Sequence, residues 1–256
     1  MDTKQIADAA AKIADARRAN KRIDRLPEGQ RPMSVAEGHA IQDAVTALLA
    51  TPIGAYKANA PAAAPVVREG VRAPIFAPQV GPTPGSFPAA SIPQLGVEGE
   101  VAFRFTRDLP PRATPYTEAE VVGALEACAA IEVCGSRWAD DKAAGLPEKI
   151  ADCVSNVGFV HGPIVKSWGH LDFGTIKVEL LVNDRPVLTQ EGGHPGDGPV
   201  GVAVALVEML RGTTGVKAGQ FVTCGSYTGL RYVEPGDTCR VRFAGLGEAE
   251  VSFPTG

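Results

Sequence analysis

A segment with two glutamates on one face is the feature that most constrains this chain. Side chains alternate between the two faces of a strand, so Glu98 and Glu100 in residues 97–103 point the same way, roughly 6–7 Å apart. The other face of this segment is apolar. Two like charges side by side on a half-buried surface are destabilising unless a cation or a proton neutralises them. The segment therefore predicts a strand that holds a cation, against the simpler interpretation that both glutamates lie on a solvated outer face.

A third glutamate supports the cation site. Glu132 lies within residues 125–134, a stretch that is almost entirely apolar, where an unpaired carboxylate costs several kcal/mol or has a raised pKa. Three carboxylates suit magnesium or manganese better than zinc, which prefers nitrogen and sulfur ligands. Glu98, Glu100 and Glu132 therefore predict a site for Mg²⁺ or Mn²⁺.

Composition excludes several classes of protein. The chain has 256 residues, 45% of them hydrophobic, enough for one large domain or one domain with an appendage. A net charge of −4 without a basic stripe argues against a nucleic-acid partner. No apolar run is long enough to span a membrane and no targeting signal is recognisable, so we expect a cytoplasmic protein without a membrane partner. Five cysteines at irregular positions predict reduced, mostly buried thiols.

The N-terminal fifth of the chain is predicted to be helical. Residues 3–20 have apolar side chains at helical spacing, and Ser34 with Glu37 forms a capping box that opens a second helix towards Leu49. Nine prolines follow between positions 51 and 95. They exclude long helices, and we expect this proline-rich region to wrap over a site.

The rest of the chain is predicted to be rich in strands. A capping box of Thr117 and Glu120 starts a helix to about Glu126 or beyond, and a further helix covers residues 199–210. Asn183-Asp184 is a typical hairpin turn between two of the predicted strands. The β-branched runs that predict strands are residues 176–182, 186–189, 221–225, 239–243 and 250–253.

Seven short motifs follow one another in a specific order. They are Gly54-Ala55-Tyr56-Lys57, Pro74-Ile75-Phe76, residues 97–103, residues 131–137, Ile150-Ala151-Asp152, Gly193-His194-Pro195, and residues 217–220 leading to Gly225-Ser226. Their order and spacing resemble the 2-keto-4-pentenoate hydratase and 4-oxalocrotonate decarboxylase branch of the fumarylacetoacetate hydrolase superfamily. The resemblance covers almost the whole chain.

This resemblance implies an α+β fold. A helical portion, residues 1–50, would pack on a mixed β-roll of residues 51–256 like the C-terminal domain of fumarylacetoacetate hydrolase, and the two would form one structural unit. Members of the branch commonly form oligomers, and hydratases and decarboxylases associate with each other. We therefore expect a homo-oligomer and consider association with a related lyase.

The resemblance also implies roles for individual residues. Glu98, Glu100 and Glu132 would hold the metal. Lys57 and Asp152 would be catalytic. The substrate would contact Tyr56, Ile75, Ser155 and Ser226. Without the resemblance, Lys57 would be interpreted as a surface lysine beside a proline-rich loop.

Such a site suits a small unsaturated 2-oxo acid. The acid would chelate the metal through its carboxylate and keto oxygens, and the cation would stabilise the enolate that forms when a carbon beyond the keto group exchanges a proton or CO₂. Hydration of a substrate such as 2-keto-4-pentenoate is the leading hypothesis. Decarboxylation of the 4-oxalocrotonate type is the alternative. C–C bond hydrolysis and a non-catalytic partner subunit are weaker alternatives.

Two departures from the branch bear on this choice. Hydratases often carry an acid at the position of Ile75, so proton handling is expected to differ here. The usual A-D-N-A-S-S run contains Cys153 and Asn156 in this chain, which changes the polar groups of the pocket. Both departures favour decarboxylation, or an unusual substrate, over hydration.

Overall fold

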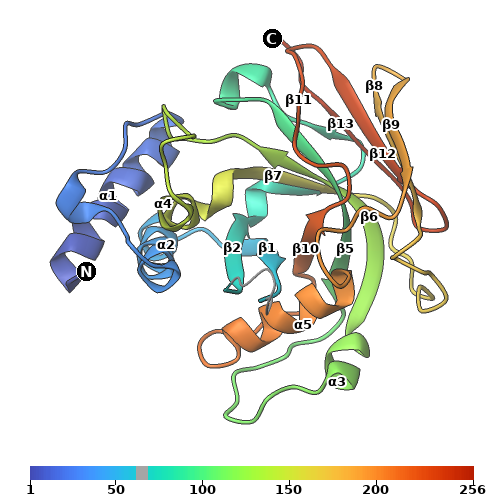
Figure 1. Cartoon of the computed structure of the whole chain (residues 1–256), viewed down its shortest axis with the longest axis horizontal. Helices are drawn as coiled ribbons and strands as arrows, with labels where there is room; N and C mark the ends of the chain where they lie inside the picture. The colour runs from blue at the N-terminus through green and yellow to red at the C-terminus, as the bar shows by residue number, and fades with distance from the viewer. Residues whose placement is uncertain (62–68) are drawn as a thin grey trace.

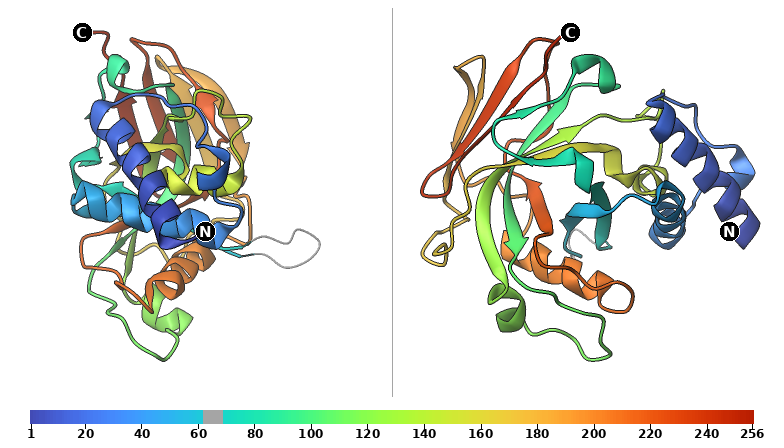
Figure 2. Two further views of the ribbon diagram at one scale, coloured as in Figure 1. Left: turned by 90° about the vertical axis from the view of Figure 1, so that its left-hand side faces the viewer. Right: turned by 180° about the vertical axis from the view of Figure 1, so that it is seen from behind.

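The computed structural model describes residues 1–61 and 69–256 and contains a helical portion beside two β-sheets (Figure 1). Helices α1 (Thr3–Ala19), α2 (Val35–Leu49) and α4 (Leu146–Ala151) gather at one side of the molecule. The sheets and further helices form the remainder, and the view from behind shows the same separation (Figure 2, right). This arrangement confirms the predicted α+β class. Among the described residues, no helix combines the length and hydrophobicity needed to cross a bilayer.

The N-terminal helices have an apolar cluster of their own. Asp2 caps α1, since its side chain accepts a hydrogen bond from the amide of Gln5 at 2.8 Å. Buried Ile13 of α1 packs with Ile41 of α2 and with Trp138 from the loop that precedes α4. Each large side chain buried in this way stabilises the fold by about 1.5–3 kcal/mol. The cluster fixes the helical portion against the loop that precedes α4.

The large sheet curls around the interior of the molecule. Its strand order is β2-β1-β10-β5-β6-β7-β3, and β11 pairs with β5 as the eighth strand. β1 and β10 are parallel, as are β3 and β7, and the other neighbours are antiparallel, so the sheet is mixed. The strands are β1 (Ile53–Asn59), β2 (Val71–Phe76), β3 (Val80–Pro82), β5 (Gly96–Phe105), β6 (Leu125–Cys134), β7 (Asn156–His161), β10 (Phe221–Ser226) and β11 (Arg231–Tyr232).

The small sheet packs against one face of the large one. Its order is β4-β13-β12-β8-β9. Asn183 and Asp184 turn between β8 and β9 with φ of 49° and 61°, which confirms the predicted hairpin. The strands are β4 (Gly85–Ser86), β8 (Lys177–Val182), β9 (Arg185–Glu191), β12 (Thr238–Phe243) and β13 (Gly247–Ser252).

The main core lies between the two sheets and under α5 (Pro199–Leu210). Val101 and Phe103 of β5 are fully buried there with Val241 of β12 and Leu206 of α5. The approach of the sheets is close at Gly99, where a Cβ atom would come within 2.6 Å of a methyl carbon of Val241. This packing occupies one face of β5 and leaves Glu98 and Glu100 on the other face.

One predicted boundary is wrong. Thr117 and Glu120 form the predicted capping box, but α3 (Glu118–Val122) ends before residue 123 instead of continuing to about Glu126. Residues 125–134 form β6, which pairs with β5 along its whole length. Burial on both faces of β6 explains why tertiary pairing overrides the helical start signal. The predicted helices at 3–20, 35–49 and 199–210 are confirmed.

The described part of the proline-rich region forms short elements, as predicted. Besides β1 to β4 it contains two short 3₁₀ turns, at Ala77–Gln79 and Ala89–Ser91. Pro65 lies outside the described residues. β1 and β2 line the interior of the curled sheet, so this region contributes to the candidate site described next.

Candidate metal centre and active site

Three strands bring two carboxylates and a lysine together inside the curled sheet. Glu98 of β5 and Glu132 of β6 are direct cross-strand partners. The ammonium of Lys57, from β1, lies 2.8 Å from Glu132 Oε1 and 3.5 Å from Glu98 Oε2. Glu132 is fully buried, and the side chains of Lys57 and Glu98 are 18% and 17% exposed. Lys57 is therefore an interior lysine, and the alternative of a surface lysine is wrong.

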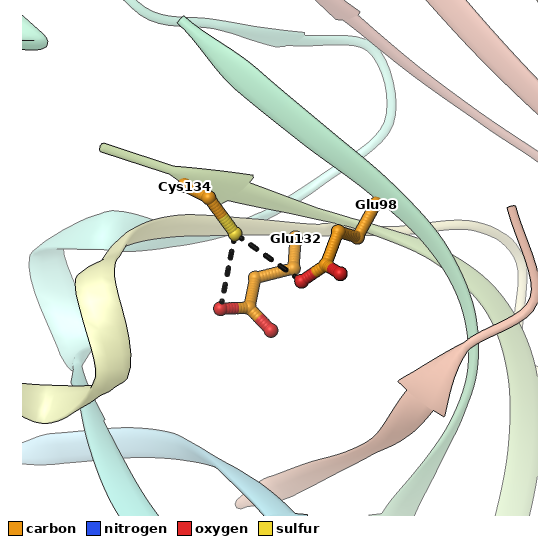
Figure 3. Close-up of side chains that lie close together, drawn as sticks. All are labelled: Glu98, Glu132 and Cys134. Atoms are coloured by element: carbon orange, nitrogen blue, oxygen red, sulfur yellow. Dashed lines mark hydrogen bonds between the residues drawn. The ribbon is translucent and has the colours of Figure 1, made fainter. Parts of the chain in front are cut away.

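A thiol completes this group. Cys134 lies two residues after Glu132 on β6 and therefore on the same face. Its Sγ is 3.4 Å from Glu98 Oε2 and 3.5 Å from Glu132 Oε1, and the three side chains converge (Figure 3). The sequence interpretation treated all five cysteines only as buried thiols, which they are. Strand alternation was the signal that could have placed this one at the site.

Glu100 faces the same interior but is held by β10. Its Oε2 accepts hydrogen bonds from the hydroxyl of Thr223 and from the amide of Gly225, the latter at 2.6 Å. Burial, and then the charges of Glu132 and Glu98, raise the pKa of Glu100 to about 8. A carboxyl group with that pKa binds a proton at neutral pH. A further cation would relieve the repulsion among these carboxylates.

Glu132 has one crowded oxygen and one vacant one. Oε1 accepts from Lys57 and from the side-chain amide of Asn156 at 3.0 Å. Oε2 is buried and has no hydrogen-bond partner among the described residues. Burial raises the pKa of Glu132, while Lys57 opposes that rise. An unpartnered buried carboxylate oxygen is costly, so it marks a position where a ligand is expected.

Lys57 is the counter-ion of this group. Burial lowers its pKa, but the charges of Glu132, Cys134, Glu98 and Glu100 together raise the pKa well above the usual lysine value. The side chain therefore carries a full positive charge beside the carboxylates. An ammonium between two carboxylates shows that this position accommodates a cation.

A left-handed turn positions Asn156. Cys153, Val154 and Ser155 have φ of 54°, 51° and 60°, values that cost non-glycine residues roughly 1–2 kcal/mol each. The carbonyl of Ser155 accepts from the amide of Gly135 at 2.8 Å, which ties the turn to the end of β6. Such strain persists only where surrounding contacts enforce it, and it is common at functional sites. Ser155 and Cys134 line a small cavity of about 30 Å³.

Ile75 and Ser226 lie on the interior face as well. Ile75 on β2 pairs with Ala55, two residues before Lys57, and is fully buried with Phe159 and Phe221. These three side chains form an apolar floor on the same interior face of the sheet as Lys57. Ser226 is the partner of Glu100 across β10 and β5, and its buried hydroxyl has no hydrogen-bond partner among the described residues. Contact of either side chain with substrate stays a prediction.

Tyr56 lies elsewhere, contrary to expectation. It precedes Lys57 on β1 and therefore points to the opposite face. Its side chain lines a separate cavity of about 330 Å³ together with Arg72 and Pro74. The structure does not bring Tyr56 to the carboxylates, because adjacent residues of a strand cannot share a face.

Asp152 also lies apart from the carboxylates. Its Oδ1 is 2.9 Å from Nε of Arg17 on α1 and 3.7 Å from Nη1 of Arg137. Arg17 also donates to the carbonyl of Asp152 at 2.8 Å. The side chains of this pair are almost completely buried. These contacts give Asp152 a structural role, since they join α1 to the turn that carries Asn156, and its catalytic role stays a prediction.

Replacing Asp152 by alanine is expected to lower the free energy of unfolding by about 3–5 kcal/mol, because the buried charge of Arg17 would lose its carboxylate partner. Asp15→Ala, which breaks the exposed ion pair with Arg18, is the control and should change it by less than about 1 kcal/mol. Denaturant titration measures both. If Asp152→Ala stays as stable as the control but kcat falls a hundredfold or more, the residue acts in catalysis and the structural assignment is wrong.

The group formed by Glu98, Glu132 and Cys134 fits a divalent cation. One ligand atom from each residue lies within 4.8 Å of the others. The vacant Glu132 Oε2 and the surplus of carboxylates over cations favour the same conclusion. Glu98 and Glu132 would hold the ion, with Glu100 beside them.

Comparison with known proteins finds relatives that carry the names of the branch that the motifs resemble. No family model matches the chain. The 2-keto-4-pentenoate hydratase of Paraburkholderia phymatum is 32% identical over 169 residues, which are 65% of this chain and 63% of the relative. The 4-oxalocrotonate decarboxylase of Pseudomonas sp. strain CF600 is 30% identical over 129 residues, 48% of this chain and 47% of that relative. The chain thus spans less than two thirds of the length of these curated relatives.

Solved structures share the fold. The 4-oxalocrotonate decarboxylase of Pseudomonas putida G7, complexed with magnesium and adipate, superimposes with a TM-score of 0.80 over 99% of this chain and 98% of its own, at 20% identity. The fumarylpyruvate hydrolase of Pseudomonas aeruginosa, in complex with Mn²⁺ and pyruvate, has a TM-score of 0.57 at 15% identity and covers 79% of this chain and 89% of its own. The chain is therefore a homologue of 2-keto-4-pentenoate hydratases and 4-oxalocrotonate decarboxylases, and it shares the fold of the 4-oxalocrotonate decarboxylase of Pseudomonas putida G7.

Proposed function

We propose that this protein is a divalent-metal-dependent lyase that adds water to a small unsaturated 2-oxo acid such as 2-keto-4-pentenoate. The observation that carries the proposal is the interior group of Glu98, Glu132 and Lys57, whose carboxylates outnumber their cations. The names of the relatives support the same reaction class. Mg²⁺ or Mn²⁺ is the proposed ion, because a hard cation matches carboxylate ligands.

Some residues of the site would position the carboxylates, and Lys57 would transfer a proton. A bound divalent ion would supply positive charge where negative charge develops on the keto oxygen of the substrate. Asn156 orients Glu132, and Thr223 orients Glu100, so both carboxylates have fixed positions. Lys57 would pair with the substrate carboxylate once a metal ion replaces it as the partner of Glu132, and it could then donate a proton to the substrate.

Decarboxylation of a related 2-oxo dioic acid is the second candidate, and Ile75 favours it. The floor formed by Ile75, Phe159 and Phe221 is apolar, and the imidazole of His161 stacks on Phe221 with the ring centroids 4.5 Å apart. An apolar floor excludes water from the reacting carbons and favours loss of CO₂ over hydration. C–C bond hydrolysis and a non-catalytic subunit stay weaker alternatives.

The test of the proposed function is a substrate panel. The protein is stripped with chelator and assayed on 2-hydroxypenta-2,4-dienoate and 4-oxalocrotonate with added Mg²⁺ or Mn²⁺. We expect loss of dienoate absorbance that depends on the metal, and release of CO₂ from 4-oxalocrotonate would identify the decarboxylase. Full turnover in excess chelator would reject metal dependence. Size-exclusion chromatography with light scattering tests the predicted homo-oligomer.

Ile75→Asp is expected to raise the ratio of hydration to decarboxylation, because a carboxylate in the floor can relay protons to water. It should also lower the free energy of unfolding by several kcal/mol, since Ile75 is fully buried. Ile75→Asn is the matched polar variant without an acid. Product analysis at a temperature where all three proteins are folded measures the ratio. An equal ratio in the three proteins would place Ile75 outside the reacting region.

A further inference from the structure

The group beside Lys57 contains a sulfur atom that the proposed reaction does not use. Cys134 Sγ lies 3.4 Å from Glu98 Oε2 and 3.5 Å from Glu132 Oε1, with both of its neighbours on the same interior face (Figure 3). The thiol is 5% exposed, so it contacts the group rather than bulk water.

Hydrogen bonding alone does not account for this arrangement. A thiol has one proton, so it can donate to only one of the two carboxylate oxygens at a time. Glu132 Oε1 already accepts from Lys57 and Asn156. Glu132 Oε2, fully buried, has no partner among the described residues. Donors crowd one oxygen and leave the next one vacant, which indicates that a ligand is missing from this group.

The distances match those between ligand atoms around one tetrahedral ion. With a metal–sulfur bond of about 2.3 Å and a metal–oxygen bond of about 2.0 Å, tetrahedral geometry separates sulfur from oxygen by about 3.5 Å. Both sulfur–oxygen distances here agree with that value. A small ion could therefore bind Cys134 Sγ, Glu98 Oε2 and Glu132 Oε1 without movement of the strands once the ammonium of Lys57, 2.8 Å from Glu132 Oε1, moves away.

We propose that Cys134 is a ligand whose use depends on the metal: Zn²⁺ or Co²⁺ binds its sulfur together with Glu98 and Glu132, whereas Mg²⁺ binds the carboxylates alone. Thiolate is a soft ligand that favours zinc and cobalt, and magnesium takes oxygen ligands. When the metal–sulfur bond forms, the S–H bond breaks and the proton passes to solvent, without any change of oxidation state. The inference rests on the proposed metal site and specifies which ions that site distinguishes.

The test compares Cys134→Ala with Cys128→Ala. Cys128 lies on the same face of β6 and is fully buried in an apolar cluster, where its Sγ donates a hydrogen bond to the carbonyl of Ala102 at 3.7 Å. Metal-stripped protein is titrated with Co²⁺ and followed by the sulfur-to-cobalt charge-transfer band in the near ultraviolet. Dissociation constants for Zn²⁺ and Mg²⁺ are measured by calorimetry. Cys134→Ser, which retains the size and polarity of the side chain, is the second variant, and thermal melts confirm that each protein is folded.

We expect the band in the wild type and in Cys128→Ala, and its loss in Cys134→Ala and Cys134→Ser. The Zn²⁺ affinity should fall at least about tenfold in Cys134→Ala, and the Mg²⁺ affinity should change less than about threefold. A wild type that binds Co²⁺ without the band, or an equal loss of Zn²⁺ and Mg²⁺ affinity in Cys134→Ala, would overturn the proposal. In both cases retained Mg²⁺ binding by the wild type leaves the proposed function standing, whereas a wild type that binds no divalent ion rejects both.

Discussion

Replacing Glu132 by glutamine is expected to abolish divalent-metal binding and turnover while the chain stays folded. Glu132 is fully buried between Lys57, Asn156 and Cys134, and its buried Oε2 has no hydrogen-bond partner among the described residues. Glutamine keeps the shape of the side chain but removes its charge. Loss of a ligand that supplies several kcal/mol of transition-state stabilisation lowers kcat/KM by about 10³-fold or more.

The fold should tolerate this change because two effects oppose each other. Glu132→Gln relieves the repulsion that raises the pKa of Glu100, and it weakens the pair with Lys57. We expect the free energy of unfolding to change by no more than about 1–2 kcal/mol. Glu98→Gln should give the same loss of metal binding.

Glu126→Gln is the matched control. Glu126 lies on the same strand and pairs with Arg104 at 2.5 Å, away from Lys57 and the other glutamates. Calorimetric titration with Mg²⁺ and Mn²⁺ measures binding, and denaturant titration measures stability. Wild-type metal affinity in Glu132→Gln would contradict the site, as would a loss of affinity in Glu126→Gln of the same size.

Strand alternation predicted the local part of this site. It placed Glu98 and Glu100 on one face and the apolar residues on the other, as found. The same rule places Tyr56 on the opposite face of its strand from Lys57. Applied to residues 131–137, it places Cys134 on the same face as Glu132. Substrate contact by Tyr56 stays a prediction that this placement does not support.

The rest of the site depends on contacts between distant parts of the chain. Glu98 and Glu132 meet because of the register between β5 and β6, which no local pattern specifies. Asp152 pairs with Arg17, 135 residues earlier, and this contact has no motif. Asn156 reaches Glu132 through a left-handed turn of non-glycine residues, a conformation that composition does not predict.

The fold was more predictable than its boundaries. Helical periodicity located α1, the capping residue Ser34 located the start of α2, and Pro199 located the start of α5. The helix expected to reach Glu126 ended four residues earlier because β6 begins at Leu125. Local helix signals predicted the helices correctly where the segment does not pair in a sheet. Where the segment is buried on both faces, strand pairing determined the structure instead.

Replacing Lys57 by methionine is expected to lower kcat by about 10²- to 10⁴-fold and to leave metal binding intact. Methionine fills a similar volume without the charge. Because the ammonium lies 2.8 Å from Glu132, its removal takes away a positive charge that repels an incoming cation. Mg²⁺ should therefore bind at least as tightly as in the wild type, so that activity and affinity change in different directions.

That separation distinguishes a catalytic lysine from a structural one. Lys217→Met removes an exposed lysine that pairs with Asp108 at 3.0 Å and should leave kcat, KM and metal affinity unchanged. Lys57→Arg retains the charge but not the compact ammonium, so it should restore stability without restoring kcat. If Lys57→Met loses metal binding together with kcat, the lysine only organises the carboxylates. If it retains wild-type kinetics, proton transfer depends on another group, and Asp152 becomes the residue to test next.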